Sequence, residues 1–214
     1  MKLINNVTQK KLFVYIFSLF CIGTLIISYI YKINLSNLFG SVEPSPFLLQ
    51  FNIYVKNGGV VSDLATHWQY IQILREDILN LFSYEMGVDT KLLNYPLHNI
   101  IFSQLYFLAD DIKKYLFIYF CLSLVIPYLF FLNLSIALKK TSKYLLFLIS
   151  VLIYILPAFQ YSAIWGNNHL TALFFFLIGT LFHLKTRDYN YKKFRYSLIS
   201  IFFLSLAAYT KQYY

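Results

Sequence analysis

Charged residues and cysteines are scarce in this chain of 214 residues, and each scarcity excludes a class of protein. Only 13% of the residues are charged, against about 25% in a typical soluble domain, while 59% are hydrophobic. Cys21 and Cys121 both lie in apolar segments, so the chain has neither a disulfide framework nor a metal-binding cysteine spacing. This composition is typical of an integral membrane protein in a lipid bilayer.

Several enzyme signatures are also missing. The sequence has no His-Glu-x-x-His zinc motif, no Gly-rich phosphate loop and no Gly-x-Ser-x-Gly nucleophile motif. The net charge of +9 does not come from a basic stripe interleaved with stacking aromatic residues. We therefore expect no nucleic acid partner, and the positive charge calls for another explanation.

Five segments are apolar enough to cross a bilayer, which takes roughly 20 helical residues. They are residues 12–31, 115–138, 144–163, 169–184 and 196–210. The first has the basic flank of a signal peptide, but its apolar run exceeds the about 7 to 15 residues of a signal-peptide core, and no cleavage site follows. We predict an all-α integral membrane protein of about five transmembrane helices.

The basic residues lie in three clusters that this topology places on one side of the membrane. The clusters are Lys2, Lys10 and Lys11; Lys139, Lys140 and Lys143; and Lys185, Arg187, Lys192, Lys193 and Arg195. By the positive-inside rule that side is the cytoplasm, so the N-terminus is cytoplasmic and residues 33–114 form a large outward loop. We expect a bacterial inner or plasma membrane.

The outward loop carries most of the polar chemistry of the chain. It holds all the acidic residues except Asp188, namely Glu43, Asp63, Glu76, Asp77, Glu85, Asp89, Asp110 and Asp111. Apolar residues recur at steps of three to four from Asp63 to Phe82, which predicts an amphipathic helix. In that register Asp63 and His67 lie on or beside the buried face, one turn apart.

A second helix is predicted in the loop. The apolar run in residues 92–108 is too short to cross unaided, so it favours an interfacial or re-entrant helix that starts at Pro96, with His98 in its first turn.

Two interpretations of Asp63 are open. In the first, it only caps the helix by accepting backbone N–H bonds. In the second, it is a catalytic base whose pKa is raised by poor solvation at the membrane boundary. His67 would then orient the carboxylate or share a divalent metal with it, or else it has a purely structural role. No complete set of metal ligands is identified.

Four segments, in this order, are similar to motifs of one known family. They are SDLATHWQYIQIL at residues 62–74, LNYPLHNII at residues 93–101, IWGNNHLTALFFFLIG at residues 164–179 and AAYTKQYY at residues 207–214. They resemble the Asp-x-x-x-His first-loop motif, the Tyr-Pro-Pro-Leu segment, a Gly-Gln-x-Asp turn and a Lys-Gln element of the GT-C superfamily of membrane glycosyltransferases.

This resemblance implies a transfer of sugar from a polyprenyl-phosphate donor to an acceptor on the non-cytoplasmic face. Asp63 and His67 would be the catalytic residues, with Asp63 as the base. The residues expected to bind substrate are Tyr95, His98, Lys211 and Gln212, with Lys211 on the donor phosphate. Members of the family carry further spans, so residues 1–214 are expected to form one membrane domain, the N-terminal portion of a larger protein or an inactive fragment.

Two other functions compete with this one. A transporter, flippase or polymerase-like component of a polysaccharide pathway would place polar residues within the spans, and the predicted spans carry no charge between their ends. A membrane scaffold whose loop binds a partner protein would tolerate substitution of Asp63 and His67.

Overall fold

The computed structural model describes residues 2–31, 61–82, 96–105, 107–188 and 193–210, and this part of the chain contains helices and no strands. The helices are α1 (Lys2–Tyr31), α3 (Val61–Glu76), η2 (Ile78–Phe82), α5 (Leu97–Gln104), α6 (Ile112–Ala137), α7 (Lys143–Val151), η4 (Leu152–Ile155), α8 (Pro157–Trp165), α9 (His169–Asp188) and α10 (Lys193–Thr210). The predicted all-α class is confirmed for these residues.

Three helices are long and apolar enough to cross a membrane. They are Gln9–Ile30 within α1, Ile112–Ala137 (α6) and His169–Arg187 within α9, and they coincide with three of the five predicted spans. α10 covers the fifth predicted span but is not among the three. Large apolar side chains of α1, such as Leu19 and Phe20, are more than half exposed, as expected for a surface that meets lipid. These features indicate a membrane protein, while the five-span topology stays a prediction.

The predicted span over residues 144–163 is not one straight helix. Lys143–Ile155, which comprises α7 and η4, meets α8 at an angle of 60°. Pro157 is the first residue of α8 and follows the extended residue Leu156. Proline has no N–H to continue the preceding helix and disfavours helical geometry in the residue before it. Gln160 is fully buried at this bend and donates from Nε2 to the Tyr154 carbonyl at 2.9 Å, so a side chain replaces a backbone donor that the bend removes.

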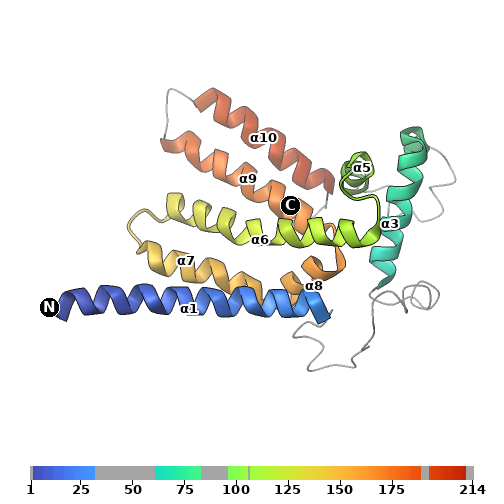
Figure 1. The fold of residues 1–214 in the computed structure, drawn as a ribbon. Coiled ribbons are helices and arrows are strands. Elements are labelled where there is room, and N and C mark those ends of the chain that lie inside the picture. Colours follow the sequence, from blue (N-terminus) through green and yellow to red (C-terminus); the bar gives the residue numbers. More distant parts are fainter. Residues whose placement is uncertain (1, 32–60, 83–95, 106, 189–192, 211–214) are drawn as a thin grey trace.

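The long helices lie side by side in the order α1, α7, α6, α9 and α10, with α3 and α5 across one end (Figure 1). α10 packs closely on α9 because Gly179 presents no side chain to it: a Cβ there would lie 2.8 Å from Cγ of Leu204. Ser200 of α10 donates to the Gly179 carbonyl at 2.9 Å. Asn133 of α6 similarly donates to the Leu177 carbonyl of α9 at 2.9 Å. Small and polar side chains therefore join the helices, as is common between helices in membranes.

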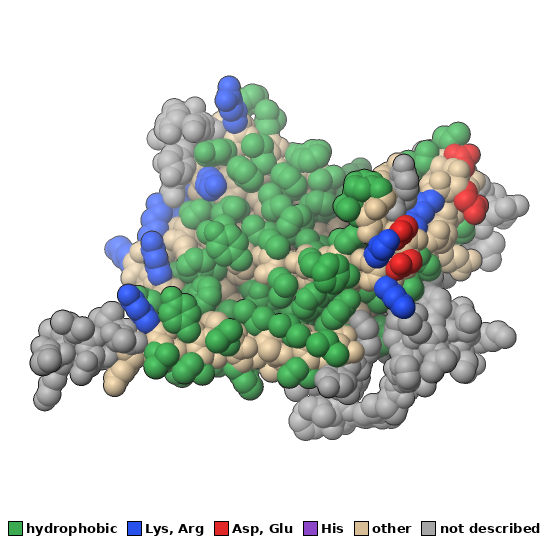
Figure 2. Space-filling model, viewed as in Figure 1, with side chains coloured by type: hydrophobic (Ala, Val, Ile, Leu, Met, Phe, Trp, Pro, Cys, Tyr) green, Lys and Arg blue, Asp and Glu red, His purple; other side chains and the backbone are tan. Residues whose placement is uncertain are grey.

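Charge is distributed unevenly between the two ends of the bundle (Figure 2). The start of α1, the connection from α6 to α7, and the residues that flank the connection from α9 to α10 lie at one end, with their lysines and arginines. We call this the basic end. The acidic side chains that the structure describes lie at the opposite end, near α3 and the start of α6. The described members of the three basic clusters thus share one end, as predicted, and the assignment of that end to the cytoplasm stays a prediction.

α3, η2 and α5 are described helices of the predicted outward loop. The helix predicted from Asp63 to Phe82 is instead two pieces, since α3 ends at Glu76 and η2 follows. The Asp77 carboxylate accepts from the Leu79 N–H at 2.8 Å, a local bond that competes with continuation of the α-helix. α5 begins at Leu97, directly after Pro96, as predicted. α3 and α5 pack against each other and cover the end of the bundle.

Candidate functional site

A buried network of polar side chains lies where α3 and α5 cover the ends of α6 and α9. We call it the histidine cluster, and its members are His67, His98, Asn99, Tyr115, Tyr119 and Thr171. Each member is 9% exposed or less. Polar groups taken out of solvent must find partners within the protein, so their hydrogen bonds determine how these four helices fit together.

His98 is the centre of the histidine cluster. It is fully buried, its Nδ1 lies 3.0 Å from Oγ1 of Thr171 and its Nε2 lies 3.0 Å from the hydroxyl of Tyr115. The Tyr115 hydroxyl also lies 2.6 Å from the Gly166 carbonyl, which can only accept. Because the phenol has one proton and must give it to that carbonyl, Nε2 of His98 is the donor to the Tyr115 oxygen. The bonds therefore place a proton on Nε2 of His98, and when the ring is neutral its Nδ1 accepts from the Thr171 hydroxyl.

The turn between α8 and α9 is shaped to receive the two tyrosines of α6. Gly166 ends α8 in the left-handed conformation, with φ of 63°, which favours glycine. A Cβ at Gly166 would lie 2.6 Å from Cε1 of Tyr115, so the absence of a side chain is also required for the tyrosine to fit. The next residue, Asn167, accepts a hydrogen bond on its carbonyl from the Tyr119 hydroxyl. The turn thus exposes two backbone carbonyls inside the bundle, and the tyrosines satisfy both.

His67 joins α3 to α5. It lies on the same face of α3 as the buried residues Leu64 and Ile71, three positions before it and four after it, as the helical register predicts. Its Nδ1 is 3.0 Å from Oδ1 of Asn99, and its ring meets that of His98 edge to face with 5.0 Å between centroids. With Asn99 as acceptor, Nδ1 of His67 is the donor.

The electrostatics of the histidine cluster favour uncharged side chains. Burial lowers the pKa of His98 well below its ordinary value, and the neighbouring His67 lowers this pKa further. A charged imidazole at this position would lose its hydration and gain no carboxylate among the hydrogen-bond partners found for it. A buried, neutral and internally bonded imidazole of this kind is suited to positioning helices.

Arg75 closes the outer edge of the site. Its guanidinium donates to the carbonyls of Phe102, Ala109 and Asp110, which lie at the end of α5 and in the connection to α6. It also lies over the ring of Trp68, 5.1 Å from the centroid. Burial lowers the pKa of Arg75, and the Asp110 carboxylate opposes that shift. One side chain of α3 therefore holds the connection that leads into α6.

Two of the predicted site residues come together and the others fall outside the described side chains. His67 and His98 are in direct contact, although 31 positions separate them in the sequence. The backbone of Asp63 lies in α3 one turn before His67, but its side chain is outside the described residues. Tyr95, Lys211 and Gln212 are also outside them.

The C-terminal end of α10 nevertheless reaches the same part of the fold. Asn168, in the turn before α9, donates to the carbonyl of Thr210 at 3.5 Å, and α10 also contacts α5. Thr210 directly precedes the Lys-Gln element in the sequence. Each of the four segments that carry the family resemblance therefore has a described residue at this end of the bundle. These residues are His67, His98, Asn168 and Thr210.

Sequence reasoning did not single out Tyr115, Tyr119, Asn99 and Thr171. The available signal was the spacing of the two tyrosines, which are four residues apart on one face of an apolar helix, with polar tips that need partners. Sequence patterns do not show which residues supply those partners.

Within the described ranges, no three His, Cys, Asp or Glu side chains are grouped to hold a metal ion.

The chain was also compared with known proteins. No protein-family model, no curated protein and no solved structure matches it.

Proposed function

We propose that this protein is a membrane glycosyltransferase that moves a sugar from a polyprenyl-phosphate donor to an acceptor hydroxyl. The observation that carries the proposal is the convergence of the four motif segments. His67 from the first contacts His98 from the second, Thr171 from the third bonds to His98, and Asn168 bonds to the end of α10 that leads into the fourth. A common site for residues so far apart in the sequence supports a shared function.

In this proposal the histidine cluster is a support and Asp63 is the reactive group. The cluster fixes α3 against α5, α6 and α9, and so holds the backbone of Asp63 one helical turn from His67. His67 and His98 are positioning residues, because both are buried and His98 has each ring nitrogen in a hydrogen bond.

The chemistry requires a base and a site for an anion. The acceptor oxygen attacks the anomeric carbon of the donor sugar, and the bond from that carbon to the phosphate oxygen breaks. Polyprenyl phosphate leaves with the bonding electrons, and the Asp63 carboxylate takes the proton of the acceptor hydroxyl. Lys211 would pair with the phosphate, and Tyr95 and Gln212 would contact the substrate. In the proposed orientation, the basic end faces the cytoplasm and the histidine cluster lies near the opposite membrane surface.

The test is sugar transfer in membranes that contain the full chain. Membranes are supplied with polyprenyl-phosphate hexoses that are labelled in the sugar, and incorporation into membrane acceptors is measured. A positioned base typically contributes about 10²- to 10⁴-fold to rate, so Asp63→Asn should lower transfer at least about 100-fold.

Asp110→Asn is the matched control, because this carboxylate lies at the same end of the bundle, is more than half exposed and pairs with Lys114 at 2.6 Å. It should keep activity within about twofold, since an exposed ion pair contributes little. Full transfer by Asp63→Asn would remove Asp63 from its role as base. Absence of transfer by the unsubstituted chain with every labelled donor would refute the proposed function.

A further inference from the structure

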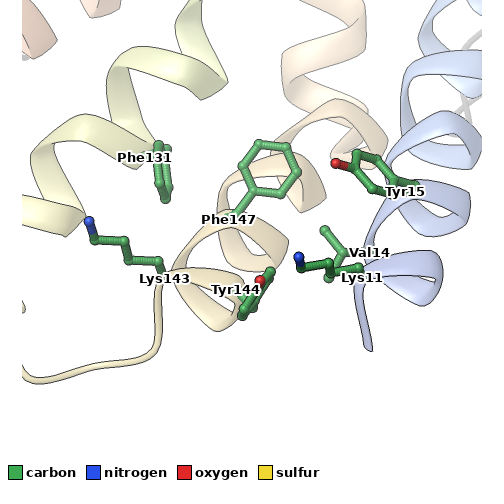
Figure 3. A pocket seen from close by; sticks show the side chains of 7 residues that line it. All are labelled: Lys11, Val14, Tyr15, Phe131, Lys143, Tyr144 and Phe147. Atoms are coloured by element: carbon green, nitrogen blue, oxygen red, sulfur yellow. The ribbon is translucent and has the colours of Figure 1, made fainter. Parts of the chain in front are cut away.

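A second candidate site lies at the basic end, far from the histidine cluster. A cavity of about 310 Å³ opens there between α1, α6 and α7 (Figure 3). Its main lining residues are Lys11 and Tyr15 of α1, Phe131 of α6, and Lys143, Tyr144 and Phe147 of α7. This volume is at the lower end of the about 300 to 1,000 Å³ that is usual for ligand pockets.

The wall of the cavity is aromatic. The rings of Phe131 and Phe147 meet edge to face, with 5.6 Å between centroids, so α6 and α7 share a rigid apolar surface. Tyr15 and Tyr144 also line the cavity and are 67% and 45% exposed. Tyrosine presents an apolar ring with a polar tip and is enriched where membrane meets water. The cavity therefore has the lining expected near the headgroup level of a bilayer.

Two lysines add positive charge to this apolar cavity. Figure 3 shows Lys11 on one side of Tyr144 and Lys143 on the other. Neither ammonium group forms an ion pair with a described residue. The ion pair within the described part of the chain joins Lys114 and Asp110, at the opposite end of the bundle. The described acidic side chains all lie at that opposite end as well. Among the described side chains, no carboxylate therefore compensates the positive charge beside the cavity.

We propose that this cavity binds one anionic phospholipid, whose phosphate pairs with Lys11 and Lys143 and whose acyl chains lie against Phe131 and Phe147. A soluble anion would satisfy the lysines but leave the aromatic wall unused. A zwitterionic lipid would cover the wall but leave the positive charge unmatched. Basic pockets between transmembrane helices on the cytoplasmic side are suited to anionic headgroups. The inference requires the membrane character of the bundle and is independent of the proposed sugar transfer.

The test measures lipid binding by native mass spectrometry of the full chain purified in detergent. Dioleoyl phosphatidylglycerol is the anionic probe, and dioleoyl phosphatidylcholine, with the same chains, is the zwitterionic one. A basic residue near an anionic surface contributes about 1 kcal/mol, roughly a fivefold change in affinity. The double variant Lys11→Gln with Lys143→Gln should therefore lose about 5- to 30-fold in affinity for phosphatidylglycerol and bind it no better than phosphatidylcholine.

The matched control removes the same charge from the same end without touching the cavity. Lys10→Gln with Lys140→Gln changes exposed lysines of α1 and of the α6–α7 connection, and its affinity for phosphatidylglycerol should stay within about twofold of the unsubstituted chain. Circular dichroism and gel filtration show that both double variants are folded.

Three results would overturn the proposal. Equal binding of both lipids by the unsubstituted chain would show that the headgroup is not recognised. Equal losses in the two double variants would assign the effect to the charge of the whole basic end. Displacement of phosphatidylglycerol by millimolar inorganic phosphate would identify a site for free anions. The first result needs no variant, so the test stands even if a substituted chain does not fold.

Discussion

Removal of one hydroxyl from the histidine cluster should measurably weaken the whole fold. The Tyr115 hydroxyl accepts from Nε2 of His98 and donates to the Gly166 carbonyl, and it therefore connects α5, α6 and the α8–α9 turn. Tyr115→Phe keeps the ring in its contacts with Trp68 and Phe102 and removes only this oxygen. The substitution isolates the hydrogen bonds from the aromatic packing.

The magnitude follows from the two groups that lose their partner. His98 is fully buried, so water cannot replace the lost bond at Nε2, and the Gly166 carbonyl faces the same interior. Each buried group left unsatisfied costs about 1–3 kcal/mol in free energy of unfolding. Hydrogen bonds measured within membrane proteins average only about 0.6 kcal/mol, because helices in the unfolded state also find partners. For the two groups together the first range gives about 2–6 kcal/mol, and the second value favours its lower limit, so we expect a loss of about 2 kcal/mol.

The assay is reversible unfolding of the full chain in mixed micelles of a mild detergent and sodium dodecyl sulfate, followed by circular dichroism and by tryptophan fluorescence. Trp68 is a direct reporter, because its ring lies 5.7 Å from that of Tyr115. Tyr128→Phe is the control, since this tyrosine of the same helix is 57% exposed and should change stability by less than about 0.5 kcal/mol. If Tyr115→Phe were as stable as Tyr128→Phe, the histidine cluster would not hold these helices together.

Two further predictions concern pH and backbone geometry. Since the folded protein lowers the pKa of His98 below its unfolded value near 6.5, stability should be constant above about pH 7 and fall as pH drops below 6.5, by up to about 1.4 kcal/mol per pH unit. Unfolding measured from pH 8 to pH 5 checks this, and His98→Gln should flatten the slope; an unchanged slope would contradict the assignment. Gly166→Ala should cost at least about 2 kcal/mol, because a residue with a Cβ is strained at φ of 63° and would contact Tyr115. Gly23→Ala, where no atom lies within 4 Å of the added Cβ, should stabilise α1 by about 0.5–1 kcal/mol, and equal effects of the two changes would refute the argument.

Local chemistry was sufficient to predict several elements. α5 begins after Pro96 because proline is favoured at a helix start, whatever surrounds it. His67 lies on the buried face of α3 because the helical period relates it to Leu64 and Ile71. Pro157 is an equally local signal for the 60° bend, whereas the length of the apolar run around it predicts one continuous span.

The partners in the histidine cluster could not be predicted in this way. His98 bonds with Thr171, 73 residues further along the chain, and with Tyr115, which the sequence shows only as the first residue of an apolar segment. Periodicity indicates which face of a helix is buried, but it does not indicate which other helix covers that face. The same holds for Lys11 and Lys143, which belong to separate basic clusters and share a cavity only because α1 packs on α7.

The sequence by itself determined the membrane character, the helical class and the separation of basic from acidic residues along the chain, because each of these depends on composition or on spacing within one segment. Only the tertiary structure decided that the two histidines meet and which carbonyls the tyrosines satisfy. The physical reason is that a buried polar group must be paired wherever the packing of helices leaves it, and that packing is set by contacts between segments far apart in the sequence.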